Sequence, residues 1–107
     1  MGLKQYTVVL VNLDPTIGSE IQKTRPCVVV SPRELNDNLN TVVIVPLTTS
    51  MNNYPTRVQI KFDNKEDRMA VDQIRTIDSK RILKKLGKIT PTEIKNLKEV
   101  IKQTYVD

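Results

Sequence analysis

Short apolar segments rich in β-branched residues recur along the chain up to Ile89, a pattern typical of strands. Segment 41–45 is apolar throughout after Thr41, which predicts a strand buried on both faces and closed by Pro46. Segment 56–62 alternates apolar and polar residues, which predicts a half-buried antiparallel strand. Pro26 cannot donate a ladder hydrogen bond, so it should start or edge its strand. The expected strands are 6–13, 26–30, 41–45, 56–62, 69–77 and 84–89, with a charged turn at 63–67.

One clear helix is expected after the last strand. Thr90 and Glu93 have the spacing of a capping box around Pro91. The apolar residues that follow lie mostly along one stripe, made by Ile94, Leu97, Val100, Ile101 and Tyr105. A short helical turn should also follow Ser31, which fits a cap before Pro32. Short strands closed by one helix predict a mainly β fold, a small barrel or sandwich, in a single domain over 1–107.

Composition and charge narrow the possible functions. The net charge of +5 and a pI near 9.5 favour polyanionic partners such as nucleic acid or an acidic protein segment. The chain has no histidine, which excludes His-based acid–base catalysis and the usual catalytic zinc ligands. Its lone cysteine, Cys27, excludes an internal disulfide, fits a reducing cytoplasm and is expected to be buried rather than nucleophilic. We expect no signal peptide and no membrane span.

The most promising stretch for chemistry is the polar loop 14–24, which runs directly into an apolar strand. Asp14-Pro15 and Gly18 are turn-forming residues, and the loop then presents Ser19, Glu20, Gln22 and other polar groups before Arg25. Functional side chains often lie on loops held by a rigid scaffold in this way. An ordinary surface connection is the alternative that the local sequence leaves open.

Three separated motifs carry a resemblance to a known family. DPTIGSEIQKTRP at 14–26, PLTTS at 46–50 and DQIRTID at 72–78 occur in the order and spacing of the MazF/PemK toxins. These are ribosome-independent mRNA endoribonucleases of bacterial toxin–antitoxin pairs. The resemblance covers essentially the whole chain and implies an SH3-like β-barrel of the MazF/Kid/CcdB type with a C-terminal helix. One departure is Lys4-Gln5-Tyr6, where many relatives have an Arg-Gly-Asp-like lead into the first strand.

The resemblance implies that Arg25 and Thr48 are catalytic. The reaction would be attack of an RNA 2′-OH on the neighbouring phosphorus, which leaves a 2′,3′-cyclic or 3′-phosphate and a 5′-OH. A guanidinium stays charged and suits the developing negative charge, and a threonine hydroxyl can add a donor. By chemistry alone Glu20 is a candidate base. On the same resemblance, Ser19, Gln22 and Gln73 would contact the RNA. Tyr54 could stack on a base, as aromatic residues do in many readers of single-stranded RNA. Glu20 and Thr49 complete the expected RNA-binding residues.

Each of these residues also has an ordinary structural interpretation. Arg25 could pair with Asp14 or Glu20, and Thr48 with Thr49 could end a strand and begin a turn. Gln73 could be a satisfied core amide. Tyr54 could cover the barrel end instead of stacking on a base. The basic residues Lys95, Lys98 and Lys102, and the cluster Arg81, Lys84, Lys85 and Lys88, are expected to be solvated faces that raise the general potential.

The partners implied by the resemblance are single-stranded mRNA, a second copy of the chain and a cognate antitoxin. The RNA groove would cross the homodimer interface, and an acidic, disordered antitoxin tail would enter the same groove. No metal or cofactor is expected. Two alternatives remain, a CcdB-like toxin that binds DNA gyrase without cleaving anything and a nuclease-dead RNA-binding module.

Overall fold

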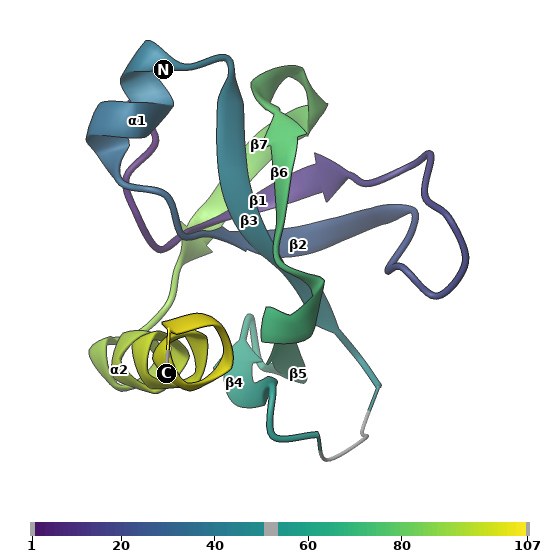
Figure 1. The fold of residues 1–107 in the computed structure, drawn as a ribbon, viewed down its shortest axis with the longest axis vertical. Helices are drawn as coiled ribbons and strands as arrows, with labels where there is room; N and C mark the ends of the chain where they lie inside the picture. Colours follow the sequence, from purple (N-terminus) through teal and green to yellow (C-terminus); the bar gives the residue numbers. More distant parts are fainter. Residues whose placement is uncertain (1, 51–53, 107) are drawn as a thin grey trace.

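The fold is a curled antiparallel sheet with one long helix packed against it (Figure 1). The computed structural model describes residues 2–50 and 54–106. Over these residues seven strands form one sheet in the order β4-β5-β3-β2-β1-β7, and β6 pairs with β3 beside this path. The strands are β1 (Thr7–Asn12), β2 (Thr24–Val29), β3 (Thr41–Thr48), β4 (Arg57–Phe62), β5 (Lys65–Ala70), β6 (Arg75–Asp78) and β7 (Ile82–Lys88).

In the described residues, five helical elements connect or cover these strands. They are α1 (Arg33–Asn38), the 3₁₀ turns η1 (Val71–Gln73) and η2 (Ser79–Arg81), α2 (Pro91–Ile101) and the π-helical turn η3 (Lys102–Val106). No helix in the described part of the chain is long and apolar enough to cross a membrane. The predicted fold class, a small barrel-like β fold with a C-terminal helix, is confirmed.

The central strands bury side chains on both faces, as their continuous apolar runs predicted. One face packs against α2 through Leu97, and its buried residues include Val8, Val28, Val45, Leu47 and Met69. The other face is covered by Ile21 of the loop after β1, and its buried residues include Val9, Val11, Cys27, Val29 and Ile44. Since successive side chains of a strand point to opposite faces, the two cores interleave residue by residue. The 13–23 loop is therefore part of the packed structure.

The start of α2 forms the capping box that the sequence predicted. The Thr90 Oγ1 accepts from the Glu93 amide at 3.2 Å, and the Glu93 Oε1 accepts from the Thr90 amide at 2.9 Å. The second Glu93 oxygen accepts from the Lys61 amide of β4 at 3.1 Å. One carboxylate thus caps the helix and also joins it to the edge of the sheet.

Two predictions about prolines were wrong. β3 does not close at Pro46 but continues to Thr48, because it changes partner there, from β2 and β6 to β5. Pro26 lies inside β2 and not at its start. The β2–β3 ladder ends at Cys27 opposite Pro46, so the missing N–H of Pro26 falls just beyond the paired region on that side.

The predicted strand 69–77 is in fact three elements, β5, η1 and β6. The predicted charged turn at 63–67 is shorter than expected. It is a two-residue hairpin turn at Asp63-Asn64, where φ is positive at both residues, 52° and 62°. Asp and Asn tolerate that conformation, so pairing resumes at once and β5 starts at Lys65. The predicted Ser31 cap was also wrong. The Ser31 hydroxyl donates to Asn36 Oδ1 at 2.5 Å, and Pro32 takes the cap position.

An ion pair fastens η1 to β4. Asp72 accepts from Arg57 Nε at 2.7 Å and Nη2 at 3.1 Å, and from the Thr56 hydroxyl at 3.0 Å. Burial alone would raise the pKa of Asp72, but the hydrogen bonds from Arg57 and Thr56 outweigh it and hold that pKa below its usual value. The Tyr105 hydroxyl of η3 donates to the Val71 carbonyl at 2.7 Å. The turn that carries Gln73 is therefore held from two sides.

Replacing Asp72 with Asn should lower the free energy of unfolding in a pH-dependent way. We expect a loss of about 1–2 kcal/mol at neutral pH, a value reduced because a third of the carboxylate side chain is exposed. A carboxyl with a lowered folded-state pKa stabilises above its unfolded pKa, near 3.9, and this contribution disappears as the pH falls through the folded pKa. Urea titrations should show the difference between the two proteins constant at pH 6–8 and shrinking below about pH 4.

The matched control is Asp37→Asn, which removes an exposed carboxylate paired with Arg33 at 3.5 Å. This variant should change stability by at most a few tenths of a kcal/mol. Equal losses in the two variants, or a loss at Asp72 that does not vary between pH 7 and pH 3, would contradict the role given to the Arg57–Asp72 pair.

Candidate functional site

Arg25 and Thr48 stand on the same face of neighbouring strands. Cys27 of β2 lies opposite Pro46 of β3. Arg25 is two residues before Cys27 and Thr48 is two residues after Pro46, so both lie on the face of the Cys27–Pro46 pair, just beyond the last paired position of this ladder. β2 and β3 cross in the middle of the fold and diverge beyond the crossing (Figure 1). The two residues, distant in sequence, are thus brought to one end of the sheet.

Arg68 belongs to the same row of side chains, which runs across neighbouring strands on one face of the sheet. Thr48 is the direct partner of Arg68 in the β3–β5 ladder, and β2, which carries Arg25, neighbours β3 on its other side. Each of these arginines is partly buried, and each has an Nε atom that is buried without a hydrogen-bond partner in the described part of the chain. Ion pairs among the described residues join Arg33 to Asp37 and Arg57 to Asp72. The alternative in which Arg25 pairs with Asp14 or Glu20 is therefore not what the structure contains.

The threonines show the turn geometry that the sequence left open. The Thr48 Oγ1 accepts from the Ser50 amide at 3.2 Å, a local bond that ends the strand and begins the next loop. This contact uses an acceptor lone pair and leaves the hydroxyl hydrogen available as a donor. Thr49 is exposed at the beginning of the loop. The structural role of Thr48 is compatible with a chemical one.

Gln73 holds the polar loop in place. Its Oε1 accepts from the Ile21 amide at 3.2 Å, and its Nε2 donates weakly to the Ser19 carbonyl at 3.5 Å. Both ends of the amide are occupied in this structure, so the satisfied-amide interpretation describes it, with loop backbone as the partner. Contact between Gln73 and an RNA base stays a prediction.

Two further arginines anchor the start of that loop. The Arg75 Nη1 donates to the Leu13 carbonyl at 3.4 Å. The Arg81 Nη1 donates to the carbonyls of Asn12, at 3.2 Å, and Asp14. Sequence reasoning missed both roles and placed Arg81 in a solvated cluster. Arg75 carried a signal, a charged residue among apolar neighbours in the DQIRTID motif, whereas Arg81 carried none.

The remaining loop residues are exposed. The Glu20 Oε1 accepts from the Ile17 amide at 2.9 Å and closes a turn inside the loop. Its carboxylate is therefore engaged locally, which weakens the case for Glu20 as the base. Ser19 presents its carbonyl to Gln73, and Gln22 is exposed. The loop is anchored through its backbone and leaves these side chains open to a ligand.

Tyr54 is half exposed and already has a partner. The Arg57 guanidinium lies over its ring at 5.3 Å from the ring centre. Base stacking on the other face of the ring stays a prediction. The preceding residues of that loop, 51–53, lie outside the described residues.

Cys27 is buried, as the sequence predicted. Burial raises the pKa of the Cys27 thiol to about 12, against a smaller opposing effect from nearby Arg75. A thiol in that state is not a nucleophile at neutral pH.

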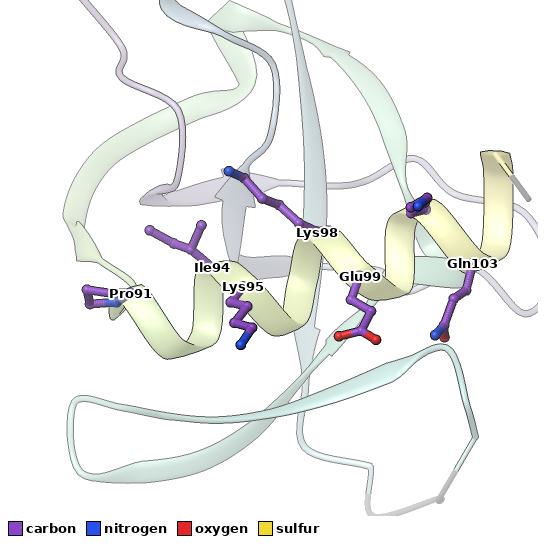
Figure 2. Close-up of a pocket in the computed structure, with 7 residues that line it drawn as sticks. Pro91, Ile94, Lys95, Lys98, Glu99 and Gln103 are labelled. Carbon is purple, nitrogen blue, oxygen red and sulfur yellow. The ribbon is translucent and has the colours of Figure 1, made fainter.

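The lysines of α2 do not form one uniform stripe. Figure 2 shows Lys98 on the opposite side of the helix from Lys95, Glu99 and Gln103, all at the edge of one open groove. The Lys98 ammonium lies 5.9 Å from the centre of the Tyr6 ring. This groove has no contact with Arg25 or Thr48, so we do not place the chemistry there.

The comparison with protein families decides the assignment of the chain. Residues 4–105 match the family model described as PemK-like, MazF-like toxin of type II toxin–antitoxin systems. The chain belongs to this PemK/MazF toxin family. The resemblance drawn from the three motifs is thereby confirmed.

Named relatives and solved structures agree with this membership. The chain is 33% identical to the endoribonuclease toxin MazF of Escherichia coli K12 over 95 residues, which are 88% of this chain and 86% of the relative. Its fold matches a MazF crystal structure from Deinococcus radiodurans with a TM-score of 0.86, at 20% identity and 96% coverage of both chains. It also matches a mycobacterial endoribonuclease solved with its cognate antitoxin, with a TM-score of 0.80, 22% identity and 94% and 92% coverage.

Removing the Gln73 amide should loosen the 13–23 loop without unfolding the sheet. In Gln73→Leu, hydrogen exchange of the Ile21 amide should accelerate roughly five- to tenfold, because a partly buried hydrogen bond contributes about 1 kcal/mol. Exchange measured by NMR reports this amide individually.

Gln73→Glu is the matched control, because a carboxylate keeps the acceptor for Ile21 and loses only the weak bond to Ser19. The Ile94 amide, bonded to the Thr90 carbonyl in α2, should be unaffected in both variants. Unchanged exchange at Ile21 in Gln73→Leu would show that Gln73 does not hold the loop.

Proposed function

We propose that this protein is the toxin of a type II toxin–antitoxin pair, an endoribonuclease that cleaves single-stranded mRNA at a short sequence without a metal ion. The observation that carries the proposal is that Arg25 and Thr48 share one face of the sheet, each two residues from the Cys27–Pro46 pair, and that the buried Arg25 Nε has no partner among the described residues. Family membership and the endoribonuclease relatives support it independently. The reaction belongs in the cytoplasm, where mRNA lies.

The 2′-OH of the RNA supplies the nucleophile in this reaction. Its oxygen forms a bond to the adjacent phosphorus, the bond from phosphorus to the 5′-oxygen breaks, and a 2′,3′-cyclic phosphate and a 5′-OH result. Water can then open the cyclic product to a 3′-phosphate. Arg25 stabilises the extra negative charge of the phosphorane, and Thr48 donates a hydrogen bond to the same phosphate. A fixed guanidinium supplies that stabilisation without a metal.

The proton of the 2′-OH must pass to a base, and the 5′-oxygen must receive one. Arginine hardly deprotonates and threonine is a weak acid, so neither is a good base. Glu20, the carboxylate that the sequence favoured, is committed to the Ile17 amide and would first have to release that bond. We therefore assign charge stabilisation to Arg25 and Thr48 and no proton transfer to Glu20. Water takes the proton of the 2′-OH and supplies one to the leaving 5′-oxygen.

The positive charge of the surface around Arg25 suits an acidic partner protein. A cognate antitoxin with an acidic, disordered tail would neutralise the row of arginines and block the RNA. The mycobacterial endoribonuclease of similar fold was solved with its cognate antitoxin, which supports such a partner here. We also propose a homodimer in which the RNA groove crosses the interface, on the basis of the family resemblance.

The direct test is cleavage of a defined single-stranded transcript in the presence of EDTA. The unmodified protein should cut it, and Arg25→Ala should be slower by roughly 10²–10³-fold, the effect of removing one donor aimed at developing charge. Mapping the 5′ ends of the fragments gives the cleavage sequence. Arg33→Ala, which removes an exposed arginine of α1 that pairs with Asp37, is the matched control and should cut at the normal rate.

Each other outcome has a distinct meaning. Equal cleavage by Arg25→Ala would remove the role of this arginine. Cleavage that requires added Mg²⁺ would refute the metal-independent mechanism. If the unmodified protein cuts no RNA under either condition, the gyrase-binding and RNA-sequestering alternatives take over.

A further inference from the structure

We propose that Arg68 is a second phosphate-binding residue of this site, and that it holds the phosphodiester next to the one on which Arg25 and Thr48 act. The inference rests on the proposed function and goes beyond it by adding a residue that neither the sequence motifs nor the chemistry of cleavage singled out. Arg68 belongs to β5, in a segment that the sequence predicted to be near a charged turn.

The register places Arg68 in the row of the site. It is the direct cross-strand partner of Thr48 in β5, and directly paired residues share one face of a sheet. Gln59 of β4 lies opposite Arg68 on its other side and is neutral. Going across the sheet, the order is Arg25, Thr48, Arg68 and Gln59, with a hydroxyl between two guanidinium groups.

Arg68 shares an uncommon state with Arg25. Among the described residues, the side-chain nitrogen and oxygen atoms that are buried without a hydrogen-bond partner are the Nε atoms of these two arginines. Burying a polar N–H without a partner costs free energy, and a bound anion would offset that cost. Two such atoms on either side of one threonine point to one extended anionic ligand.

An ordinary structural role for Arg68 is less well supported. Arginine stems often cover apolar surface while the head stays in water, but then Nε is usually hydrated rather than buried. The carboxylate nearest along the same strand face is Glu66, which lies opposite Lys61, and no ion pair joins it to Arg68 in the described residues. No ion pair among the described residues therefore neutralises the Arg68 guanidinium.

The spacing of the strands decides which phosphate Arg68 contacts. Paired neighbouring strands lie about 4.8 Å apart, and β2 is no longer paired with β3 at Arg25, so the backbones at Arg25 and Arg68 are separated by at least about 9–10 Å. Two groups so placed suit successive phosphates of an RNA strand that passes over Thr48.

The test measures affinity separately from cleavage. The probe is a fluorescent 2′-O-methyl oligonucleotide, either of the mapped cleavage sequence or of mixed sequence, which lacks the attacking hydroxyl and stays intact. In Arg68→Gln the dissociation constant should rise about five- to twentyfold. The slope of log affinity against log salt should also become shallower by about 0.7, as for one lost contact to a single-strand phosphate. On cleavable RNA the KM should rise by the same factor while kcat stays within about twofold.

Lys65→Gln is the matched control, since it removes one charge from the same strand at the exposed hairpin end. It should leave the affinity nearly unchanged. If Arg68→Gln does not fold, Arg68→Met, which retains the buried stem, takes its place. Thermal melting checks that each variant is folded.

The outcomes separate this inference from the proposed function. If Arg68→Gln binds the probe like the unmodified protein and with the same salt slope, the inference is wrong even though the enzyme cleaves RNA. A fall in kcat without a change in affinity would also overturn it, because Arg68 would then act on the scissile phosphate. Failure of the unmodified protein to cleave RNA would count against the proposed function alone.

Discussion

The register of β2, β3 and β5 is the constraint on which the candidate site depends. The pairs Cys27–Pro46 and Thr48–Arg68 set which side chains share a face at the end of the sheet. Side chains alternate between faces, so a slip of one residue in either ladder would send one member of the row to the opposite side. The two buried cores hold the register, because the same slip would expose Val28 or Leu47. Packing within the sheet therefore positions the side chains of the candidate site at one end of the sheet.

The site concentrates positive charge and does not neutralise it within the described structure. Arg75 and Arg81 are used to fix the loop backbone, whereas Arg25 and Arg68 keep unpartnered Nε atoms. Unpaired, partly buried guanidinium groups weaken a fold slightly, and the sheet beneath them is well packed. Functional sites are often the places where a protein departs from full internal pairing. The same charge would let one surface attract both the proposed RNA substrate and the proposed acidic antitoxin tail.

Much of this organisation could be predicted from the sequence, because short-range patterns determine it. The alternation in 56–62 and the capping box at Thr90 each depend on a few neighbouring residues, and both were correct. The predicted end of β3 at Pro46 was wrong, since this proline interrupts local hydrogen bonding without ending the strand. No local pattern reveals that a strand changes partner at that point.

The site was predictable only in part for the same reason. Arg25 and Thr48 were found through the motifs, and the Cys27–Pro46 pair then puts them on one face of the sheet. Arg68 could not be found, because its position depends on a hairpin that turns at Asp63-Asn64 rather than later. A two-residue turn there fixes Arg68 opposite Gln59 and beside Thr48. Recognising that turn from its Asp-Asn pair would have been the available signal.

A double-mutant cycle on Arg25 and Thr48 tests the central claim most directly, namely that these two side chains act on one phosphate. Single-turnover cleavage rates are needed for the unmodified protein, Arg25→Ala, Thr48→Ala and the double variant, each checked for folding. Groups that act as a unit give strongly non-additive losses, so the double variant should be little slower than Arg25→Ala alone. Losses that multiply in the double variant would show that the two residues act independently, and would contradict this account of the site.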